Sequence, residues 1–182
     1  ARRQYTSDLE NYLNEYIQII SYIVDTLNLD VLLLAHVIHV SDSNDKIIID
    51  ELMKRLDRRY RSRVHVVDHL IQPYEARILL GGGKATITGR MHAAVSSINM
   101  GTVPICLSYS VKFKGVIGDD FDLNDYIYQC RGDDIWASGN VHVEVIKRLN
   151  AVLENRESIL NNIASKLEAV KKKSMLQIEE LF

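Results

Sequence analysis

Residue types that can bind an anion and move a proton lie between Gly89 and Lys114. Gly89 lets the backbone approach a ligand closely, and Arg90 offers a planar guanidinium that matches a phosphate or a carboxylate. His92 adds an imidazole, a group that gains or loses a proton near neutral pH. Lys112 and Lys114 add further positive charge. This combination predicts an anion site that is able to perform acid–base chemistry.

A strand, a helix and a second strand are expected to position these residues. Ala85–Thr88 is β-prone and bounded by glycines, which predicts a buried strand. Arg90–Asn99 has the helical spacing of small and apolar residues, and Gly101 follows where a helix C-terminal glycine belongs. The apolar run Val103–Ser108 predicts the second strand. Such a unit requires a parallel sheet with a right-handed crossover, and ligands of open α/β sheets bind beyond the carboxyl ends of the strands.

The same stretch resembles part of a known family. Its segments are Thr88-Gly-Arg-Met-His92, Gly101-Thr-Val-Pro104 and Ser108-Tyr-Ser-Val-Lys112, followed by Gly115. Their order and spacing are similar to the C-terminal half of the polysaccharide pyruvyl transferases. In that family a strand is followed by a small residue, Arg, an apolar residue and His, then by Gly and Pro, then by a strand that ends in Tyr and Lys.

The resemblance implies a Rossmann-like, doubly wound α/β fold with a parallel sheet, as the C-terminal domain of a GT-B-like two-domain enzyme. We expect this domain to cover residues 1–138. Residues 139–182 are expected to form long C-terminal helices, either as a bundle or coiled-coil arm or as a segment that crosses to the other domain. The chain begins at Ala1 without Met, so a first Rossmann-like half is expected to be missing, by truncation of the chain or by cleavage of the protein.

The resemblance also implies site residues outside the central stretch. In the family a histidine often closes the first strand and an Asp soon opens the next helix, which corresponds to His36 and Asp45. His36 and His39 also fit a pair of hydrogen-bonded core histidines, and Asp45 also fits a helix cap. Glu75 matches an acidic residue that family members often carry, although its place in a first helical turn suits the helix dipole alone.

The activity that the resemblance implies is transfer of pyruvate from phosphoenolpyruvate to a sugar as a ketal. His92 is the expected general acid and Arg90 the residue that neutralises the departing phosphate, with Gly89, Lys112 and Tyr109 expected in substrate binding. No metal-ligand cluster is visible and no cofactor is expected, because phosphoenolpyruvate is the donor substrate. The acceptor is a sugar or glycan, lipid-linked or free, and its contacts are expected largely from the missing half.

Two other classes of function stay open. A GT-B-type glycosyltransferase or an epimerase would hold the diphosphate of a nucleotide sugar with the same Arg, His and Lys residues. A non-catalytic binding or assembly module would depend on the helical tail, and a tight dimer would fit that hypothesis. Binding of phosphoenolpyruvate or of nucleotide sugars distinguishes these cases.

Composition limits the class of protein. The chain has 182 residues, 47% of them hydrophobic, which is enough for a sizeable core. A formal net charge of −2 argues against a nucleic-acid-binding protein. The apolar run Val31–Val40 is too short to span a membrane, and two cysteines, Cys106 and Cys130, indicate a reducing compartment. We expect a cytoplasmic protein, either free or peripheral at the inner membrane face.

The remaining elements follow from periodicity and turn residues. Gly81-Gly-Gly83 follows an expected helix and precedes an expected strand, so it predicts a helix end and not a phosphate loop. A break is expected near Asn155 in the C-terminal helical region, and Trp136 is expected in a core. The other expected elements are helices over Leu9–Leu27, Ile47–Leu56 and Tyr74–Leu80 and strands over Val31–Val40, Arg63–Asp68 and Tyr126–Tyr128.

Overall fold

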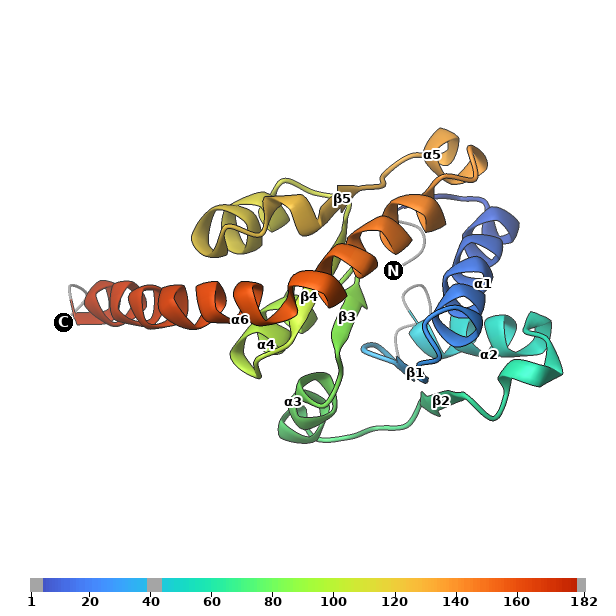
Figure 1. Cartoon of the computed structure of the whole chain (residues 1–182), viewed down its shortest axis with the longest axis horizontal. Helices are drawn as coiled ribbons and strands as arrows, with labels where there is room; N and C mark the ends of the chain where they lie inside the picture. Colours follow the sequence, from blue (N-terminus) through green and yellow to red (C-terminus); the bar gives the residue numbers. More distant parts are fainter. Residues whose placement is uncertain (1–4, 39–43, 180–182) are drawn as a thin grey trace. The chain divides into compact units, whose positions relative to one another are not determined.

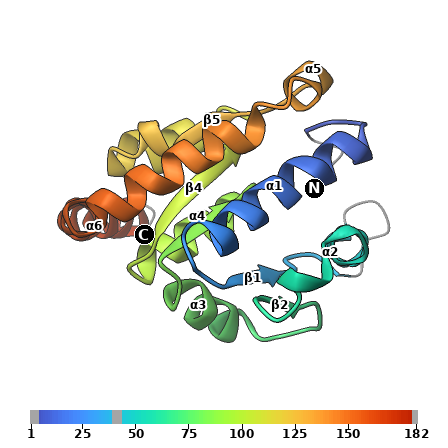
Figure 2. The same cartoon turned by 45° about the vertical axis from the view of Figure 1, so that its right-hand side comes forward.

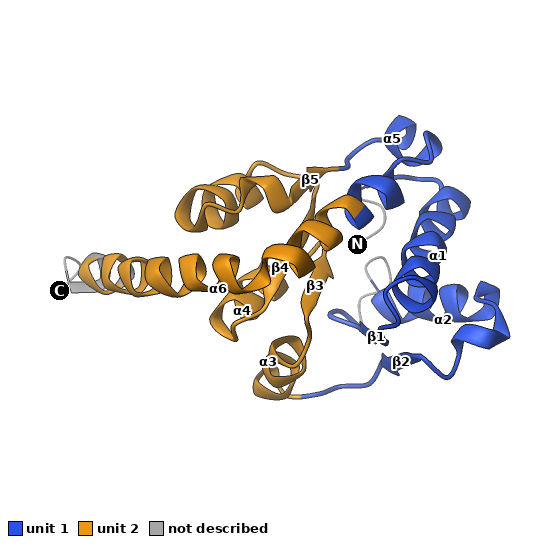
Figure 3. Ribbon diagram, in the orientation of Figure 1, with its two compact units in different colours: residues 1–71, 130–146 blue, residues 72–129, 147–182 orange. Residues whose placement is uncertain are grey.

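The computed structural model describes residues 5–38 and 44–179 and has a mixed α/β fold (Figure 1). The chain divides into two compact units, which are distinguished by colour in Figure 3. Unit 1 comprises residues 1–71 and 130–146, and unit 2 comprises residues 72–129 and 147–182. Each unit contains its own parallel sheet.

Unit 1 is built around a long amphipathic helix and a two-stranded sheet. Its sheet pairs β1 with β2 in parallel, with Val31 opposite Val64 and Leu34 opposite Val67. Leu13, Ile19 and Ile20 of α1 are almost fully buried, as the predicted apolar stripe requires. The elements of this unit are α1 (Leu9–Asp25), β1 (Val31–Leu34), α2 (Asp45–Arg55), a 3₁₀ turn (Arg58–Tyr60), β2 (Val64–Val67), α5 (Asp133–Ala137) and the start of α6 (Val141–Glu179).

An aromatic cluster holds the two chain segments of unit 1 together. Trp136 is 1% exposed, and its ring centroid lies 4.6 Å from that of Tyr12 and 5.9 Å from that of Tyr5. Its indole N–H donates a hydrogen bond to the Cys130 carbonyl at 2.7 Å. The expected core position of Trp136 is therefore confirmed, with its polar atom satisfied.

The first strand is shorter than its apolar sequence predicts. Ala35 N–H still donates to the Val67 carbonyl, but the next two amides, of His36 and Val37, donate to the carboxylate of Asp45. The Val37 N–H is the next donor that a continued strand would direct at β2, and because the Asp45 carboxylate takes it, the ladder stops and β1 ends at Leu34. His36 thus follows the strand by two residues. His39, and the end of the expected strand at Val40, lie outside the described residues.

Unit 2 contains the predicted strand–helix–strand unit. Its strands are β3 (Ala85–Thr88), β4 (Val103–Ser108) and β5 (Ile127–Gln129), all parallel and in the order β3-β4-β5. Figure 2 labels β4 and β5 of this sheet. Every residue of β4 is buried, as expected of a central parallel strand. The helix α4 (Met91–Asn99) joins β3 to β4, and α3 (Pro73–Gly81) precedes β3. Residues Lys114–Asp119 form a π-helix and Asn124–Tyr126 a 3₁₀ turn.

The C-terminal helix α6 runs from Val141 to Glu179 with one interruption. Asn155 has non-helical dihedral angles, φ −112° and ψ 17°, which places the predicted break at that residue. Beyond it, Ile159 and Ile163 are buried, and Lys166 forms an ion pair with Asp122 within unit 2. The helical region therefore consists of two helical segments that meet at a kink at Asn155, as the sequence predicts.

The parallel α/β character is confirmed, but a single doubly wound sheet is not. The hydrogen bonds divide the strands into a two-stranded and a three-stranded sheet, one in each unit. Within the described part of the chain, no helix combines the length and the apolarity that a membrane crossing needs. Cys106 and Cys130 are both buried.

Candidate functional site

The junction of β3 and α4 is fixed by a threonine hydroxyl. Thr88 is the last residue of β3, and its Oγ1 accepts a hydrogen bond from the Arg90 backbone N–H at 3.0 Å. The same hydroxyl lies 3.5 Å from the Arg90 carbonyl oxygen. Thr88 therefore closes the turn through Gly89 and sets the direction in which the chain enters α4.

Arg90 and His92 lie on either side of the first residue of α4. Arg90 is the N-cap, with extended backbone (φ −110°, ψ 115°), and its carbonyl accepts from the Ala94 N–H at 3.1 Å. Its side chain does not hydrogen-bond to the first helical turn, so it does not cap the N–H groups there. Arg90 is half-buried, whereas His92 is exposed in the first turn. A guanidinium, an exposed imidazole and the positive end of a helix dipole thus meet directly after β3.

The neighbouring strand contributes the segment after Ser108. Thr88 of β3 pairs with Cys106 of β4, so β4 extends past β3 by two residues at the same edge of the sheet. Ser108 Oγ donates to the Ser110 carbonyl at 2.8 Å and tightens the turn that follows. Lys112 is exposed in the helical turn that leads into the π-helix. π-helical turns are rare and frequently accompany functional sites.

Tyr109 and Glu75 have visible structural roles. The Tyr109 ring packs edge-on against Phe113, with centroids 6.1 Å apart, and Phe113 is buried. Glu75 accepts a hydrogen bond from the Gln72 N–H at 2.7 Å and so caps the start of α3. These contacts show that Tyr109 and Glu75 both stabilise the fold. Their contact with substrate stays a prediction.

His36 and Asp45 belong to unit 1. Asp45 Oδ2 accepts from the His36 N–H at 3.2 Å and from the Val37 N–H at 3.1 Å, and Asp45 N–H donates to the Val37 carbonyl at 2.7 Å. The carboxylate therefore holds the backbone that carries His36, while the His36 side chain is exposed. The sequence predicts that Asp45 binds substrate. Its hydrogen bonds indicate an alternative role, in which Asp45 positions His36.

Apart from Glu75, which lies in the first turn of α3, the sequence-predicted residues thus lie near strand ends of their own units. Gly89, Arg90, His92, Tyr109 and Lys112 all follow the carboxyl ends of β3 or β4 in unit 2. His36 follows β1 in unit 1, where Asp45 opens α2. Thr88, which shapes the Arg90 turn, is not among the residues predicted from sequence. A hydroxyl residue two positions before a helix N-cap is the signal that would have indicated it.

The described residues contain no group of three or more His, Cys, Asp or Glu side chains arranged to hold a metal ion. The side chains at the β3–α4 junction are cations and hydrogen-bond donors, which can surround an anion. Arg90 supplies bidentate donors, Lys112 a second cation and His92 an exchangeable proton.

Comparison with known proteins gives one result. A family model described as polysaccharide pyruvyl transferase matches residues 1–111. No curated protein and no solved structure matches the chain. The match begins at residue 1 and ends just before Lys112, so the expected location of the likeness in a C-terminal half is not supported.

Proposed function

The chain belongs to the polysaccharide pyruvyl transferase family, and we propose that it transfers pyruvate from phosphoenolpyruvate to a sugar. The product is a ketal in which two hydroxyls of the sugar join the central carbon of pyruvate, and inorganic phosphate leaves. The sugar belongs to a cell-surface polysaccharide or to its precursor. Phosphoenolpyruvate acts as the donor substrate, so the proposal needs no separate cofactor.

The β3–α4 junction is the observation that supports this donor. Phosphoenolpyruvate carries a phosphate and a carboxylate, and the junction offers two cations on neighbouring strands. Arg90, at the N-terminus of α4, suits one anionic group, and Lys112, after β4, suits the other. Gly89 leaves room for the ligand beside the backbone.

His92 is the proposed general acid. The vinyl carbon of the donor takes a proton, which converts it to a methyl group and makes the adjacent carbon electrophilic. One sugar hydroxyl then adds to that carbon, and its proton returns His92 to the imidazolium form. Phosphate leaves with the electrons of its C–O bond, and the second hydroxyl closes the ketal while its proton goes to the departing phosphate. His92 is exposed in the first turn of α4, where an imidazolium can deliver this proton while Arg90 neutralises the departing phosphate.

A thermal-shift titration with phosphoenolpyruvate tests the donor assignment. Ligand at about a hundredfold excess over its dissociation constant stabilises the fold by about 2.7 kcal/mol, and we expect such a shift for the parent protein. Arg90→Ala should abolish the shift. Lys84→Ala is the matched control, because Lys84 is an exposed cation just before β3, at the opposite edge of the same sheet.

Two outcomes would contradict the proposal. An undiminished phosphoenolpyruvate shift in Arg90→Ala would remove Arg90 from the donor site. A shift with uridine or guanosine diphosphate sugars, without one for phosphoenolpyruvate, would favour a glycosyltransferase or an epimerase instead.

A further inference from the structure

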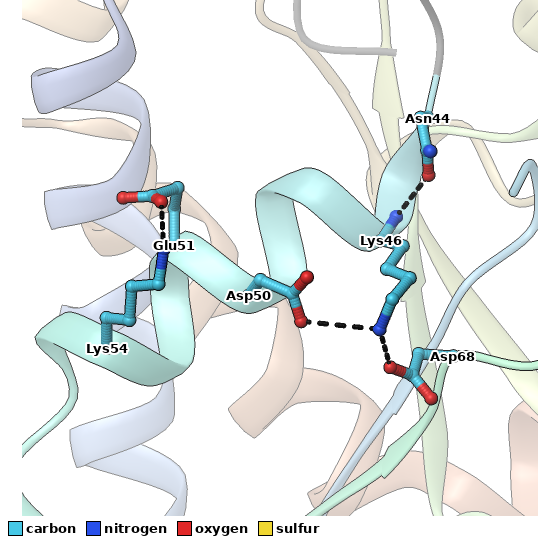
Figure 4. Close-up of polar contacts among 6 residues, drawn as sticks. All are labelled: Asn44, Lys46, Asp50, Glu51, Lys54 and Asp68. Carbon is cyan, nitrogen blue, oxygen red and sulfur yellow. Dashed lines mark hydrogen bonds and ion pairs between the residues drawn. The ribbon is translucent and has the colours of Figure 1, made fainter. Parts of the chain in front are cut away.

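A second polar cluster lies at the carboxyl edge of the sheet in unit 1. Lys46, in the first turn of α2, donates a hydrogen bond from its ammonium group to Oδ2 of Asp68, the residue directly after β2. The same Nζ lies 3.5 Å from Asp50 Oδ1, one helical turn further along α2. Figure 4 shows the ammonium group between the two carboxylates. The Lys46 backbone N–H in turn donates to Asn44 Oδ1 at 3.0 Å.

The cluster is charged and accessible. The side chains of Lys46, Asp68 and Asp50 are 40%, 32% and 48% exposed. The hydrogen bond from Lys46 holds the pKa of Asp68 below its usual value, and the same bond raises the pKa of Lys46. Lys46 and Asp68 are therefore both charged at neutral pH, and Asp50 adds a second carboxylate to the cluster.

These charges restrict the class of ligand. A phosphate or carboxylate would meet two carboxylates whose charge outweighs the single ammonium group. A divalent cation would be repelled by the ammonium group, which lies between the two carboxylates that would have to bind it. The described residues also form no metal-ligand group here. A neutral hydroxyl suits the cluster, because it accepts a hydrogen bond from Lys46 and donates one to Asp68. An ammonium group has three donors and a carboxylate has several acceptor sites, so both can form further hydrogen bonds to a ligand.

The position of the cluster favours ligand binding over a purely structural ion pair. Asp68 follows β2 directly, and Val67 is paired with Leu34, so Asp68 and the segment that carries His36 lie at the same sheet edge. Carboxyl ends of parallel strands are where α/β proteins bind ligands. The ion pair between Arg63 and Asp30 lies at the amino ends of the same two strands, where ligand binding is not expected.

We propose that Lys46 and Asp68 form a hydroxyl-binding pair that takes a sugar. The identification of this sugar with the acceptor of pyruvyl transfer rests on the proposed function, whereas the hydroxyl-binding pair itself does not. A sugar hydroxyl accepts a hydrogen bond from the Lys46 ammonium group and donates one to a carboxylate oxygen of Asp68.

Saturation-transfer NMR with the methyl glycosides of galactose, glucose and mannose, at millimolar concentration, tests the pair. We expect at least one glycoside to bind the parent protein. Asp68→Ala and Lys46→Met should each weaken that binding by about tenfold, in line with the loss of a charge-assisted hydrogen bond. Asp68→Asn keeps the shape of the side chain and should weaken binding to a smaller extent, which guards against a folding defect in Asp68→Ala. Asp30→Ala, at the opposite sheet edge, should bind as the parent does.

The outcomes separate the two proposals. Absence of glycoside binding by the parent, undiminished binding in both Asp68 variants, or equal loss in Asp30→Ala would overturn the hydroxyl-binding pair. Glycoside binding that depends on Asp68 in a protein that does not bind phosphoenolpyruvate would confirm the pair and reject its assignment to the acceptor. The phosphoenolpyruvate shift of the parent should be unchanged in Asp68→Asn.

Discussion

Glu15 of α1 and His142 of α6 are joined inside unit 1 by two contacts to one carboxylate oxygen. Glu15 Oε2 accepts from the His142 backbone N–H at 2.5 Å and lies 2.9 Å from the His142 ring Nδ1. The Glu15 side chain is only 6% exposed. A buried carboxylate thus satisfies a donor in the first turn of α6, where the helix dipole also favours negative charge.

Loss of this carboxylate should destabilise unit 1. Glu15→Ala removes the acceptor of the part-buried His142 N–H, and the loss of this hydrogen bond costs about 1–3 kcal/mol of unfolding free energy. Urea unfolding followed by the fluorescence of Trp136 measures the effect, since that residue lies in the same unit. Glu10→Ala is the control: Glu10 pairs with Arg55 on the surface, with 68% of its side chain exposed. An exposed ion pair contributes little to the free energy of unfolding. A similar loss of stability in both variants would therefore contradict the special role of Glu15.

The adjacent glycines at the end of α3 should respond differently to alanine. A Cβ on Gly81 would lie 2.8 Å from Met100 Cβ, closer than two such carbons can approach. A Cβ on Gly82 would meet its nearest atom at 3.6 Å, and Gly82 has ordinary helical dihedral angles, φ −77° and ψ −11°. Gly81→Ala should therefore cost about 1–3 kcal/mol through overpacking.

Gly82→Ala is the matched substitution one residue later. It should be neutral or stabilise the protein by about 0.4–1 kcal/mol, because alanine restricts the unfolded chain. Thermal unfolding of the two variants beside the parent checks both values. Equal melting temperatures for both variants would show that Met100 moves aside at no cost.

The two cysteines should be inert in the folded protein. Burial raises the pKa of Cys106 and of Cys130 from 9.0 to about 12. The folded chain keeps these protons where the unfolded chain releases them, so the stability they contribute is complete below pH 9.0 and is lost as the pH rises through about 12. A chromogenic thiol reagent near neutral pH should label neither residue until denaturant is added. Rapid labelling of the native protein would show that one thiol is accessible.

Local signals predicted the centre of the fold well. The bounds of β3 and β4 agree with the expected strands, because glycines and polar residues mark their ends. The end of β1 was mispredicted because it depends on the carboxylate of Asp45, which takes the Val37 N–H that would have continued the ladder. No local pattern indicates a contact of this kind.

The same distinction applies to the candidate sites. Arg90 and His92 could be found from sequence because one strand–helix turn carries both. Lys46 and Asp68 are separated by 22 positions, and only the pairing of β1 with β2 brings their segments to one sheet edge. Sequence alone shows each as an ordinary charged residue at an element boundary.

His92 should matter for turnover and not for donor binding. If it protonates the vinyl carbon, His92→Gln removes the acid but leaves Arg90 and the start of α4 in place, since His92 is exposed. We expect ketal formation to slow by about 10²–10⁴-fold while the phosphoenolpyruvate thermal shift persists. His65→Gln is the control, because His65 is an exposed histidine that pairs with Asp30 at the amino end of β2. Normal turnover in His92→Gln would exclude His92 as the acid, and loss of the thermal shift would assign it to donor binding instead.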